Sequence, residues 1–547
     1  MKLKNKKTCS FFILIILLKG LAGAQPYYDE SYFQIKILED GQTAEIISYT
    51  GAHRNTGNRH MDIPSPLQGM LITRIGDNLF KGARIESIGI PSGVTSIGNY
   101  AFQNIVLTAV TIPDTVTDIG DWAFYGNRLA EVIIPEGATT IGKSAFESNR
   151  LTSASLPNSL IAIGKSAFEN NQLTSVNIPE NLVSIEESVF YRNQLTSITI
   201  PESVTSIGRT AFGGNRLTTL TIPGSVVRLG GFYNNELTSV TIQNGVQHIE
   251  MSAFSNNKLT EITIPDSVTH IESWAFSKNL LTSVIIPDNV VALAGFDDNL
   301  LTSITIPYGV KYLGGFYNNQ LTSLSIPNSV LKIWDSAFQN NRLASISISN
   351  SVIEIHSEAF ADNRLTSIVI PDSVIVINSE AFANNQLSSV TIGSNVAVIS
   401  YGVFQNNRLA DIIIPDNVIA IYGRAFANNP LVSITIGENV AFPYHWEDGP
   451  EYGGFDPAFV AFYKSQDSMA GTYIFSDGVW SLRVNVEENE EQETDEDSEP
   501  DLSAFDNANP ENATAGKTKT VSLLWWALSV IIAGIAIAII AVKRNPL

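Results

Sequence analysis

Apolar and polar positions follow one repeated phrase along most of this chain, from about residue 67 to residue 440. A clear copy begins at Asn193 and ends at Phe212, and it reads Asn-Gln-Leu-Thr-Ser-Ile-Thr-Ile-Pro-Glu-Ser-Val-Thr-Ser-Ile-Gly-Arg-Thr-Ala-Phe. The closing phenylalanine occurs 17 times, at intervals of 22 residues except for three intervals of 20. A fixed interval of this length predicts a solenoid, in which one structural unit is stacked on the next.

The first half of the phrase predicts a β-strand. Leu195, Ile198 and Ile200 follow the spacing L-x-x-I-x-I, which is typical of the strand in leucine-rich repeats. Side chains alternate across a strand, so the two isoleucines point to the core and Thr199 points to solvent. Pro201 has no N–H to donate to a neighbouring strand, and we therefore expect it to end the strand.

The second half of the phrase predicts a return of the chain to the core. Val204 and Ile207 form a second short inward pair, Gly208 allows a turn, and Ala211 and Phe212 are apolar again. One repeat cannot bury these groups alone, whereas stacked repeats bury them against each other. Because Thr, Ser, Val and Ile are poor helix formers, we expect a mainly β fold with little helix outside the two terminal segments described below.

An asparagine lies three residues after the phenylalanine in all but the first two copies, as at Asn193 and Asn215. A bend next to the core leaves backbone N–H and C=O groups without partners, and an amide side chain supplies both a donor and an acceptor. We therefore predict an internal asparagine ladder that completes successive bends, in preference to a row of ligand-binding side chains.

The motif x-L-T-S-I-T-I-P-x-S-V-x-x-I-G-x-x-A-F-x-x-N resembles the BspA-type, or Treponema pallidum-type, leucine-rich repeat over residues 67–440. The resemblance implies a leucine-rich-repeat solenoid of about 17 repeats, most of 22 residues and three of 20. It also implies a role in adhesion at the cell surface, where family members bind host matrix proteins, other bacteria or host cells.

Both flanks of the array are expected to form caps, because an open solenoid end exposes core and strand edges. Residues 25–66 hold two alternating segments around Asp40 and predict an N-terminal β cap. Residues 441–485 predict an aromatic C-terminal cap over the last repeat, with an aromatic sugar-binding site as the alternative. The aromatic side chains concerned are Phe442, Tyr444, Trp446, Tyr452, Phe455, Phe459 and Phe462.

The two ends of the chain predict an exported protein with a membrane anchor. Residues 1–24 combine lysines, an apolar run and Ala-Gly-Ala, as a signal peptide does. Residues 521–542 carry no charge and are long enough to cross the hydrocarbon layer as a helix, which leaves residues 543–547 as a cytoplasmic tail. The array would then lie outside the cytoplasm, on the cell surface or the periplasmic side. The single cysteine, Cys9, lies within the leader, so we expect no disulfide in the mature chain.

Residues 486–520 predict an acidic, disordered stalk between the cap and the anchor. Ten of the fifteen residues from 487 to 501 are Asp or Glu, and like charges extend a segment that has no core to form. The formal net charge of −21 also argues against nucleic acid as a partner, since phosphate binding needs a basic surface.

The outward residues of the strands predict a plane of hydroxyl groups, and repeat arrays use such extended faces for binding. Trp, Tyr and Arg anchors are almost absent there, so binding would rest on many weak contacts. The alternative is that Thr and Ser simply suit an exposed sheet and keep it soluble. The candidate ligand-binding residues are Thr196, Ser197, Thr199, Thr218, Thr219, Thr221, Thr238, Ser239, Thr241, Thr302, Ser303 and Thr305.

Two further features are candidates for function. The three short copies each lack two residues in the return segment, around residues 229–232, 293–296 and 313–316, and we expect a tighter bend there, or else a tolerated deletion. His248 and His270 hold the same position in adjacent copies. Because no third ligand accompanies them, we predict surface stacking in preference to a metal site.

The sequence contains no HExxH, GxSxG, P-loop or dinucleotide-binding motif, and we expect no enzyme activity, catalytic residue, cofactor or metal. The predicted function is adhesion, or recognition of extracellular proteins or glycans, host matrix included, through the repeat array. The alternative is a structural surface spacer without a dedicated ligand.

Overall fold

The computed structural model describes residues 30–51, 60–81, 83–443, 455 and 457–483, which all fall within one compact unit, Met1–Asn485. The predicted signal peptide (1–24), stalk (486–520), anchor (521–542) and tail (543–547) lie outside the described residues. Within the described ranges, no helix has both the length and the apolar character needed to cross a membrane.

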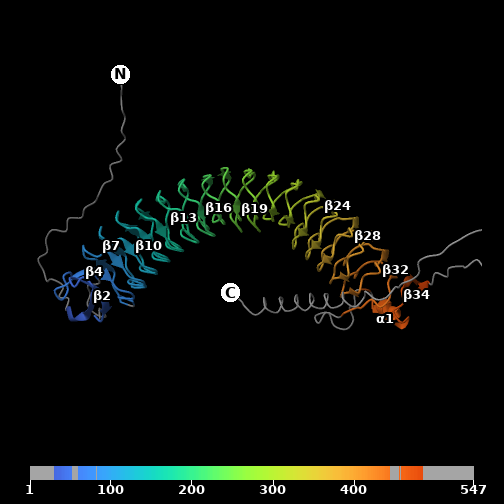
Figure 1. Ribbon diagram of the computed structural model, residues 1–547, viewed down its shortest axis with the longest axis horizontal. Helices are drawn as coiled ribbons and strands as arrows, with labels where there is room; N and C mark the ends of the chain where they lie inside the picture. Colours follow the sequence, from blue (N-terminus) through green and yellow to red (C-terminus); the bar gives the residue numbers. More distant parts are fainter. Residues whose placement is uncertain (1–29, 52–59, 82, 444–454, 456, 484–547) are drawn as a thin grey trace, which may run out of the picture. The chain divides into compact units, whose positions relative to one another are not determined.

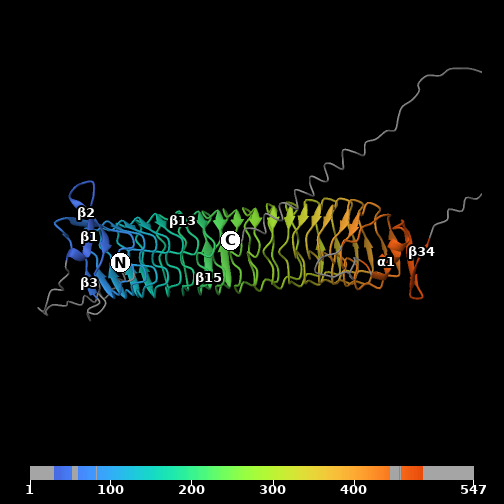
Figure 2. The ribbon, with the colours of Figure 1, turned by 90° about the horizontal axis from the view of Figure 1, so that it is seen from below.

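The repeats stack side by side along an arc (Figure 1). Seen from below, the strands form two rows, one marked by β13 and the other by β15 (Figure 2). Across the described residues, helix is confined to η1 (Glu30–Tyr32) and α1 (Pro457–Ser465). The predicted mainly β, leucine-rich-repeat solenoid is therefore confirmed.

The more continuous row contains the second inward pair of each copy, and we call it the return row. Its paired strands are parallel and in register, as where Ile185 pairs with Ile207. The return row comprises β4 (Leu71–Ile75), β6 (Ser96–Ile97), β8 (Asp118–Ile119), β10 (Thr140–Ile141), β12 (Ala162–Ile163), β13 (Ser184–Ile185), β14 (Ser206–Ile207), β16 (Arg228–Leu229), β18 (His248–Ile249), β19 (His270–Ile271), β20 (Ala292–Leu293), β21 (Tyr312–Leu313), β23 (Lys332–Ile333), β25 (Glu354–Ile355), β27 (Val376–Ile377), β29 (Val398–Ile399) and β31 (Ala420–Ile421).

The second row contains the L-x-x-I-x-I segments, and we call it the leucine row. Its paired strands are also parallel, as where Leu220 of β15 pairs with Val240 of β17. The leucine row comprises β3 (His60–Asp62), β5 (Ser87–Gly89), β7 (Ala109–Thr111), β9 (Glu131–Ile133), β11 (Ser153–Ser155), β15 (Thr219–Ile222), β17 (Ser239–Ile242), β22 (Ser323–Ser325), β24 (Ser345–Ser347), β26 (Ser367–Val369), β28 (Ser389–Thr391), β30 (Asp411–Ile413) and β32 (Ser433–Ile436).

The leucine row is less regular than the sequence predicts. The copy that begins at Leu195, for example, contributes no strand to this row. Leu195 and Ile200 are nevertheless buried, so the apolar pattern is satisfied by stacking alone. The bond from Thr196 N to Thr174 O is long, at 3.4 Å, whereas Thr238 N donates to Thr218 O at 2.9 Å next to the paired β15 and β17. Burial therefore fixes which side chains point inward, and it does not by itself form a ladder.

A continuous stack of phenylalanine rings runs through the core of the array. Neighbouring rings are nearly parallel, and their centroids lie 5.0 to 5.8 Å apart. The stack joins Phe80, Phe102, Phe124, Phe146, Phe168, Phe190, Phe212, Phe232, Phe254, Phe276, Phe296, Phe316, Phe338, Phe360, Phe382, Phe404 and Phe426. Offset stacking of this kind adds to the free energy gained from burying the rings.

Left-handed residues on both sides of the ring turn the chain towards the core. In the copy that ends at Phe212, these residues are Thr210 (φ 57°) and Gly214 (φ 64°). A β-branched residue rarely adopts a positive φ, so Thr210 is held there by its surroundings. Its hydroxyl lies 2.7 Å from that of Ser188 in the preceding copy.

The predicted asparagine ladder is confirmed at Asn193. Its Nδ2 donates to Phe190 O at 3.2 Å and to Phe168 O of the preceding copy at 2.9 Å. Its Oδ1 accepts from Leu173 N, also in the preceding copy, at 3.0 Å. The same bonds recur along the array as far as Asn429, whose Oδ1 accepts from Leu409 N. Each bend is thus completed by the amide of the copy that follows.

The described parts of both flanks extend the array. At the N-terminal end, β1 (Phe33–Ile37) and β2 (Thr43–Tyr49) form an antiparallel hairpin, and β2 runs parallel to β4. At the other end, β33 (Gly471–Ser476) pairs antiparallel with β32 and with β34 (Val479–Arg483). The strand edge of the last repeat is therefore covered. Tyr444, Trp446 and Tyr452 of the predicted aromatic cap lie outside the described residues.

Candidate functional site

All twelve predicted hydroxyl-bearing residues are exposed on the leucine row, and we call the whole outward surface of that row the hydroxyl face. Nine of them lie on three adjacent copies, where Thr219 pairs with Ser239 and Thr221 with Thr241. Thr302, Ser303 and Thr305 are separated from that group by the copies that begin at Leu259 and Leu281. The structure therefore brings nine of the candidates into one surface and leaves three apart.

Part of the hydroxyl face serves the stacking of the repeats. Thr238 Oγ1 donates to Thr218 O of the preceding copy at 3.3 Å. Thr152 and Ser388 make equivalent bonds to Ala130 O and Thr366 O. A hydroxyl in this position can still accept a hydrogen bond from a ligand.

Four exposed apolar side chains interrupt the hydroxyl face, and the sequence analysis missed them. Ile133 is 71% exposed, Ile285 is 85%, Val369 is 64% and Ile413 is 67%. Each lies four residues after the repeat leucine, the position of Thr199, so the signal was present in the pattern. Together with Glu131, Glu261 and Asp411, these side chains make the surface amphipathic rather than uniformly polar.

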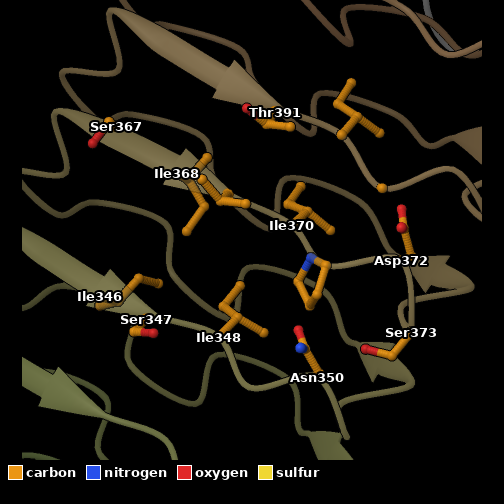
Figure 3. Close-up of a pocket in the computed structure, with 14 residues that line it drawn as sticks. Ile346, Ser347, Ile348, Asn350, Ser367, Ile368, Ile370, Asp372, Ser373 and Thr391 are labelled. Atoms are coloured by element: carbon orange, nitrogen blue, oxygen red, sulfur yellow. The ribbon is translucent and has the colours of Figure 1, made fainter.

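A hollow of about 700 Å³ opens where β24, β26 and β28 end. Figure 3 shows the hydroxyls of Ser347 and Ser367 on one side and the Asp372 carboxylate on the other, with Ile348 and Ile370 between them. None of the twelve predicted residues contributes to it. The hollow is lined by Ile346, Ser347, Ile348, Asn350, Ser367, Ile368, Val369, Ile370, Pro371, Asp372, Ser373, Thr391, Ile392 and Gly393.

Substitutions at the proline position accompany this hollow. Ser349 and Gly393 stand where most copies have proline, on either side of Pro371. A side chain at Gly393 would collide with the carbonyl of Pro371. Asp372 Oδ1 accepts from the backbone N–H of Ser394 at 2.7 Å and from its hydroxyl at 2.9 Å. These bonds hold the pKa of Asp372 below its usual value, so the rim of the hollow carries a negative charge at neutral pH.

The two histidines in adjacent copies stack as predicted. The rings of His248 and His270 lie 4.7 Å apart, centroid to centroid, with 20° between their planes. The pKa of His248 is lowered, mainly by partial burial and secondly by the nearby His270. Among the described residues, no group of three or more His, Cys, Asp or Glu side chains is placed to hold a metal ion.

The aromatic side chains after the array are used largely for packing. Phe459 and Tyr463 are fully buried, and the Tyr463 hydroxyl donates to Gly437 O at 2.7 Å. Phe455 stacks on Phe426, the last ring of the array, at 4.6 Å. A hollow of about 340 Å³ remains beside Phe455 and Trp480.

The stacked turns, the phenylalanine stack and the asparagine ladder define a leucine-rich-repeat solenoid, a class of scaffold that presents an extended surface to other proteins. A family model described as "BspA type Leucine rich repeat region (6 copies)" matches the array in five overlapping segments. These segments are residues 73–195, 123–231, 183–295, 227–343 and 331–443. The chain therefore belongs to the BspA-type leucine-rich-repeat family, as its motif indicates.

Several solved structures are similar to this chain. A leucine-rich-repeat protein of T. pallidum is 26% identical, over 34% of this chain and 88% of its own, with a TM-score of 0.30. A leucine-rich cell surface protein of Faecalibacterium prausnitzii is 23% identical, over 77% and 91%, with a TM-score of 0.26. A leucine-rich-repeat protein of Bacteroides ovatus is 20% identical, over 72% and 93%, with a TM-score of 0.35. None of the curated proteins matches the chain.

Proposed function

We propose that this protein acts in adhesion or recognition and binds extracellular proteins or glycans through the hydroxyl face. The observation that carries the proposal is the exposure of nine hydroxyl-bearing residues on three adjacent copies, from Thr196 to Thr241. Family membership supports the coarser part, because leucine-rich-repeat proteins generally bind proteins and BspA-type members are typically found at the cell surface.

The chemistry of the face favours many modest contacts over a few strong ones. Hydroxyl groups offer hydrogen bonds, and isolated apolar residues such as Ile133 and Ile285 offer small contact areas. The hollow next to Val369 provides a place where a side chain or sugar ring could be enclosed. Repetition along the array would then raise the affinity by multivalency.

Display outside the cytoplasm is part of the proposal. It is supported by the leader-like residues 1–24 and the uncharged residues 521–542. Both segments fall outside the ranges that the structure describes. Detection of the array on intact cells by an antibody, before and after protease treatment, would test this part separately.

The main experiment measures binding of purified full-length protein to immobilised matrix proteins and glycans at physiological salt. The test variant carries Thr199→Lys, Thr221→Lys and Thr241→Lys on the hydroxyl face. Its matched control carries Thr205→Lys, Val227→Lys and Gln247→Lys, three exposed positions beside the return row of the same three copies. Both variants change the net charge by the same amount.

We expect saturable binding by the wild type and the control, and at least a tenfold loss of affinity in the hydroxyl-face variant. Equal binding by all three proteins would contradict the proposal that the hydroxyl face is the binding surface. No binding by the wild type to any surface would favour a structural spacer without a dedicated ligand.

A further inference from the structure

A recess of about 650 Å³ lies over the two adjacent short copies, residues 293–296 and 313–316, and we call it the notch. None of the twelve residues of the hydroxyl face lines it, so it is a separate surface. Its aromatic and acidic lining residues are Trp274, Asp297, Tyr317, Trp334, Asp335 and Glu358.

Backbone hydrogen bonds show which residues the short copies lack. Ala294 N and Gly295 O make the bonds to the preceding copy that Gly142 N and Ala145 O make in a full-length copy. The two missing residues therefore correspond to Lys143 and the residue after it. The deletion shortens the bend between the return row and the phenylalanine stack.

Two glycines place no side chain in the short bends beneath the notch. Gly295 and Gly315 adopt φ angles of 99° and 73°. A Cβ at Gly315 would collide with the backbone nitrogen of Gly295, so the two short bends lie directly against each other. The expectation of a tighter bend in these copies is confirmed, and the recess is its consequence.

Full-length copies on either side supply two tryptophans. Trp274 precedes the short copies and is 53% exposed. Trp334 follows them, lies against Gly314, and stacks on Tyr312 with centroids 6.1 Å apart and 7° between the rings. Two indole rings thus border a recess whose floor is backbone.

Elsewhere in the array, the chain itself shows what binds a tryptophan at this position. Trp122 and Trp274 both lie two residues before the repeat phenylalanine. Lys143 Nζ lies 4.8 Å from the centroid of the Trp122 ring, which is cation–π geometry. The deletion removes the Lys143 position from the copy that follows Trp274, so this copy supplies no such cation.

The charge of the notch is negative. Its lining residues include Asp297, Asp335 and Glu358 and contain no Lys, Arg or His. Asp297 is only 6% exposed, and its Oδ1 accepts from Tyr317 N at 2.9 Å. Burial, with Asp298 beside it, raises the pKa of Asp297 to about 6, so the carboxyl is still ionised at neutral pH. The nearest basic partner of Asp335 is His356, whose Nδ1 lies 3.9 Å from its Oδ1.

We propose that the notch binds a basic side chain, arginine by preference, presented by an exposed segment of a protein partner. The planar guanidinium can stack on the indole of Trp274 while its N–H groups donate to the carboxylates. Arginine is also the charged residue most often found as an anchor in protein interfaces. The proposal concerns a second surface and does not depend on the hydroxyl face.

The test uses full-length protein and a fluorescein-labelled peptide with one arginine between Gly and Ser residues. The comparison peptide replaces arginine by citrulline, which has nearly the same shape without the charge. Fluorescence anisotropy at physiological salt should show saturable binding of the arginine peptide and at least tenfold weaker binding of the citrulline peptide. Similar affinity for both peptides, or no binding of the arginine peptide, would overturn the proposal.

Variants locate the binding. Trp274→Ala and Asp297→Asn should each weaken binding of the arginine peptide at least fivefold, whereas Trp122→Ala, at the equivalent position of another copy, should leave it unchanged. Glu358→Gln provides a second charge variant should Asp297→Asn fail to fold, as judged by circular dichroism. Equal losses in Trp122→Ala and Trp274→Ala would indicate attraction to the acidic protein as a whole and would contradict the proposal. A glycan is the other possible occupant. Displacement of the arginine peptide by maltose would indicate that the notch binds glycans, and this result would also contradict the proposal.

Discussion

At the scale of single residues, the internal asparagines are the most consequential side chains of the array. Asn193, for example, is buried and makes four hydrogen bonds to backbone groups, namely Phe168 O, Phe190 O, Tyr191 O and Leu173 N. Because two of these bonds cross to the preceding copy, one amide both shapes a bend and joins two repeats. This double role explains why the residue is asparagine and not any other polar residue of similar size.

We predict that Asn193→Ala lowers the free energy of unfolding by about 1–3 kcal/mol. The substitution leaves Leu173 N without an acceptor, and a buried unsatisfied backbone group costs about 1–3 kcal/mol. It also removes one of the two amide donors from Phe168 O and from Phe190 O, which keep their bonds to Asn171 and Asn215. Urea unfolding followed by circular dichroism measures the change.

The control for this prediction is Asn340→Gly. Asn340 is exposed and adopts a φ of 54°, and its side chain donates to Asn318 Oδ1 at 2.7 Å. Glycine accepts that φ without strain, so we expect a change below about 1 kcal/mol. A loss at Asn193 no larger than the loss at Asn340 would mean that the internal ladder is not needed for stability.

Asp297 gives a prediction about pH. Its pKa in the folded protein is about 6, raised by burial from an ordinary 3.8. The folded state therefore binds the proton more tightly than the unfolded chain, and this group makes the protein more stable as the pH falls from about 6 towards 4. Above pH 6 the buried negative charge of Asp297 lowers the stability of the folded protein. Asp297→Asn removes the charge and keeps an oxygen that can accept from Tyr317 N.

We expect Asp297→Asn to raise the free energy of unfolding at pH 7.5 by on the order of 2 kcal/mol. The difference between variant and wild type should shrink at pH 4.5, because wild-type Asp297 is then largely protonated in the folded state. Thermal unfolding of both proteins at the two pH values provides the measurement. A difference that stays the same at both values would contradict the assignment.

At the scale of the repeat, the short copies show how a small deletion changes a surface. In the two adjacent short copies, Gly295 and Gly315 lie in direct backbone contact, and the flanking Trp274 is 53% exposed. The other short copy has the same arrangement at Gly231, with a φ of 97° close to the carbonyl of Gly208. The glycines in these copies are therefore required by packing and not only by turn geometry.

We predict that Gly315→Ala destabilises the protein by more than about 3 kcal/mol, because it combines a strained positive φ with a collision against Gly295. Gly69→Ala is the matched control, since Gly69 has a φ of 79° and no heavy atom within 4 Å of an added Cβ. That control should lose only about 1 kcal/mol. Comparable losses in the two variants, measured by urea unfolding, would show that the close contact is unimportant.

Much of the repeat could be predicted from sequence, because its period is fixed by packing. The inward positions, the phenylalanine stack and the asparagine ladder all follow from residues that recur at one interval, such as Phe212 and Asn215. The strands of the leucine row were predicted less well, since a copy such as that of Leu195 buries its side chains without forming a ladder. Pattern reveals which side of a segment is buried, and it does not reveal hydrogen-bond lengths.

The hollows could not be predicted in the same way. The one near Asp372 accompanies replacement of proline by Ser349 and Gly393, and the notch depends on two short copies being adjacent. Both arise from departures from the repeat, whereas the sequence analysis drew its site from the repeat itself. The twelve hydroxyl-bearing candidates are exposed as expected, but binding by them stays a prediction.

At the scale of the whole array, the two ends differ from the interior because each lacks one neighbour. The C-terminal end is closed by β33, which pairs with the edge of β32, and by Phe455, which covers the ring of Phe426. An uncovered parallel edge beside an exposed ring would be free to pair with another molecule.

We predict that a chain of residues 25–440 self-associates, whereas a chain of residues 25–485 stays monomeric. Size-exclusion chromatography with light scattering at several concentrations measures the difference. Both chains lack residues 486–547, so the comparison isolates the segment after the array. A monomeric shorter chain with unchanged unfolding behaviour would show that β33 and Phe455 are not needed to close the end.

The direction of the asparagine ladder has a consequence for synthesis. Every bend receives its amide from the copy that follows it, from Leu107 with Asn127 to Leu409 with Asn429. A polypeptide delivered N-terminus first therefore completes its turns in the order in which they are made, and at any moment a single turn, the most recently delivered, awaits its partner. Such a chain could assemble by addition to a finished template, without waiting for its far end to be translated.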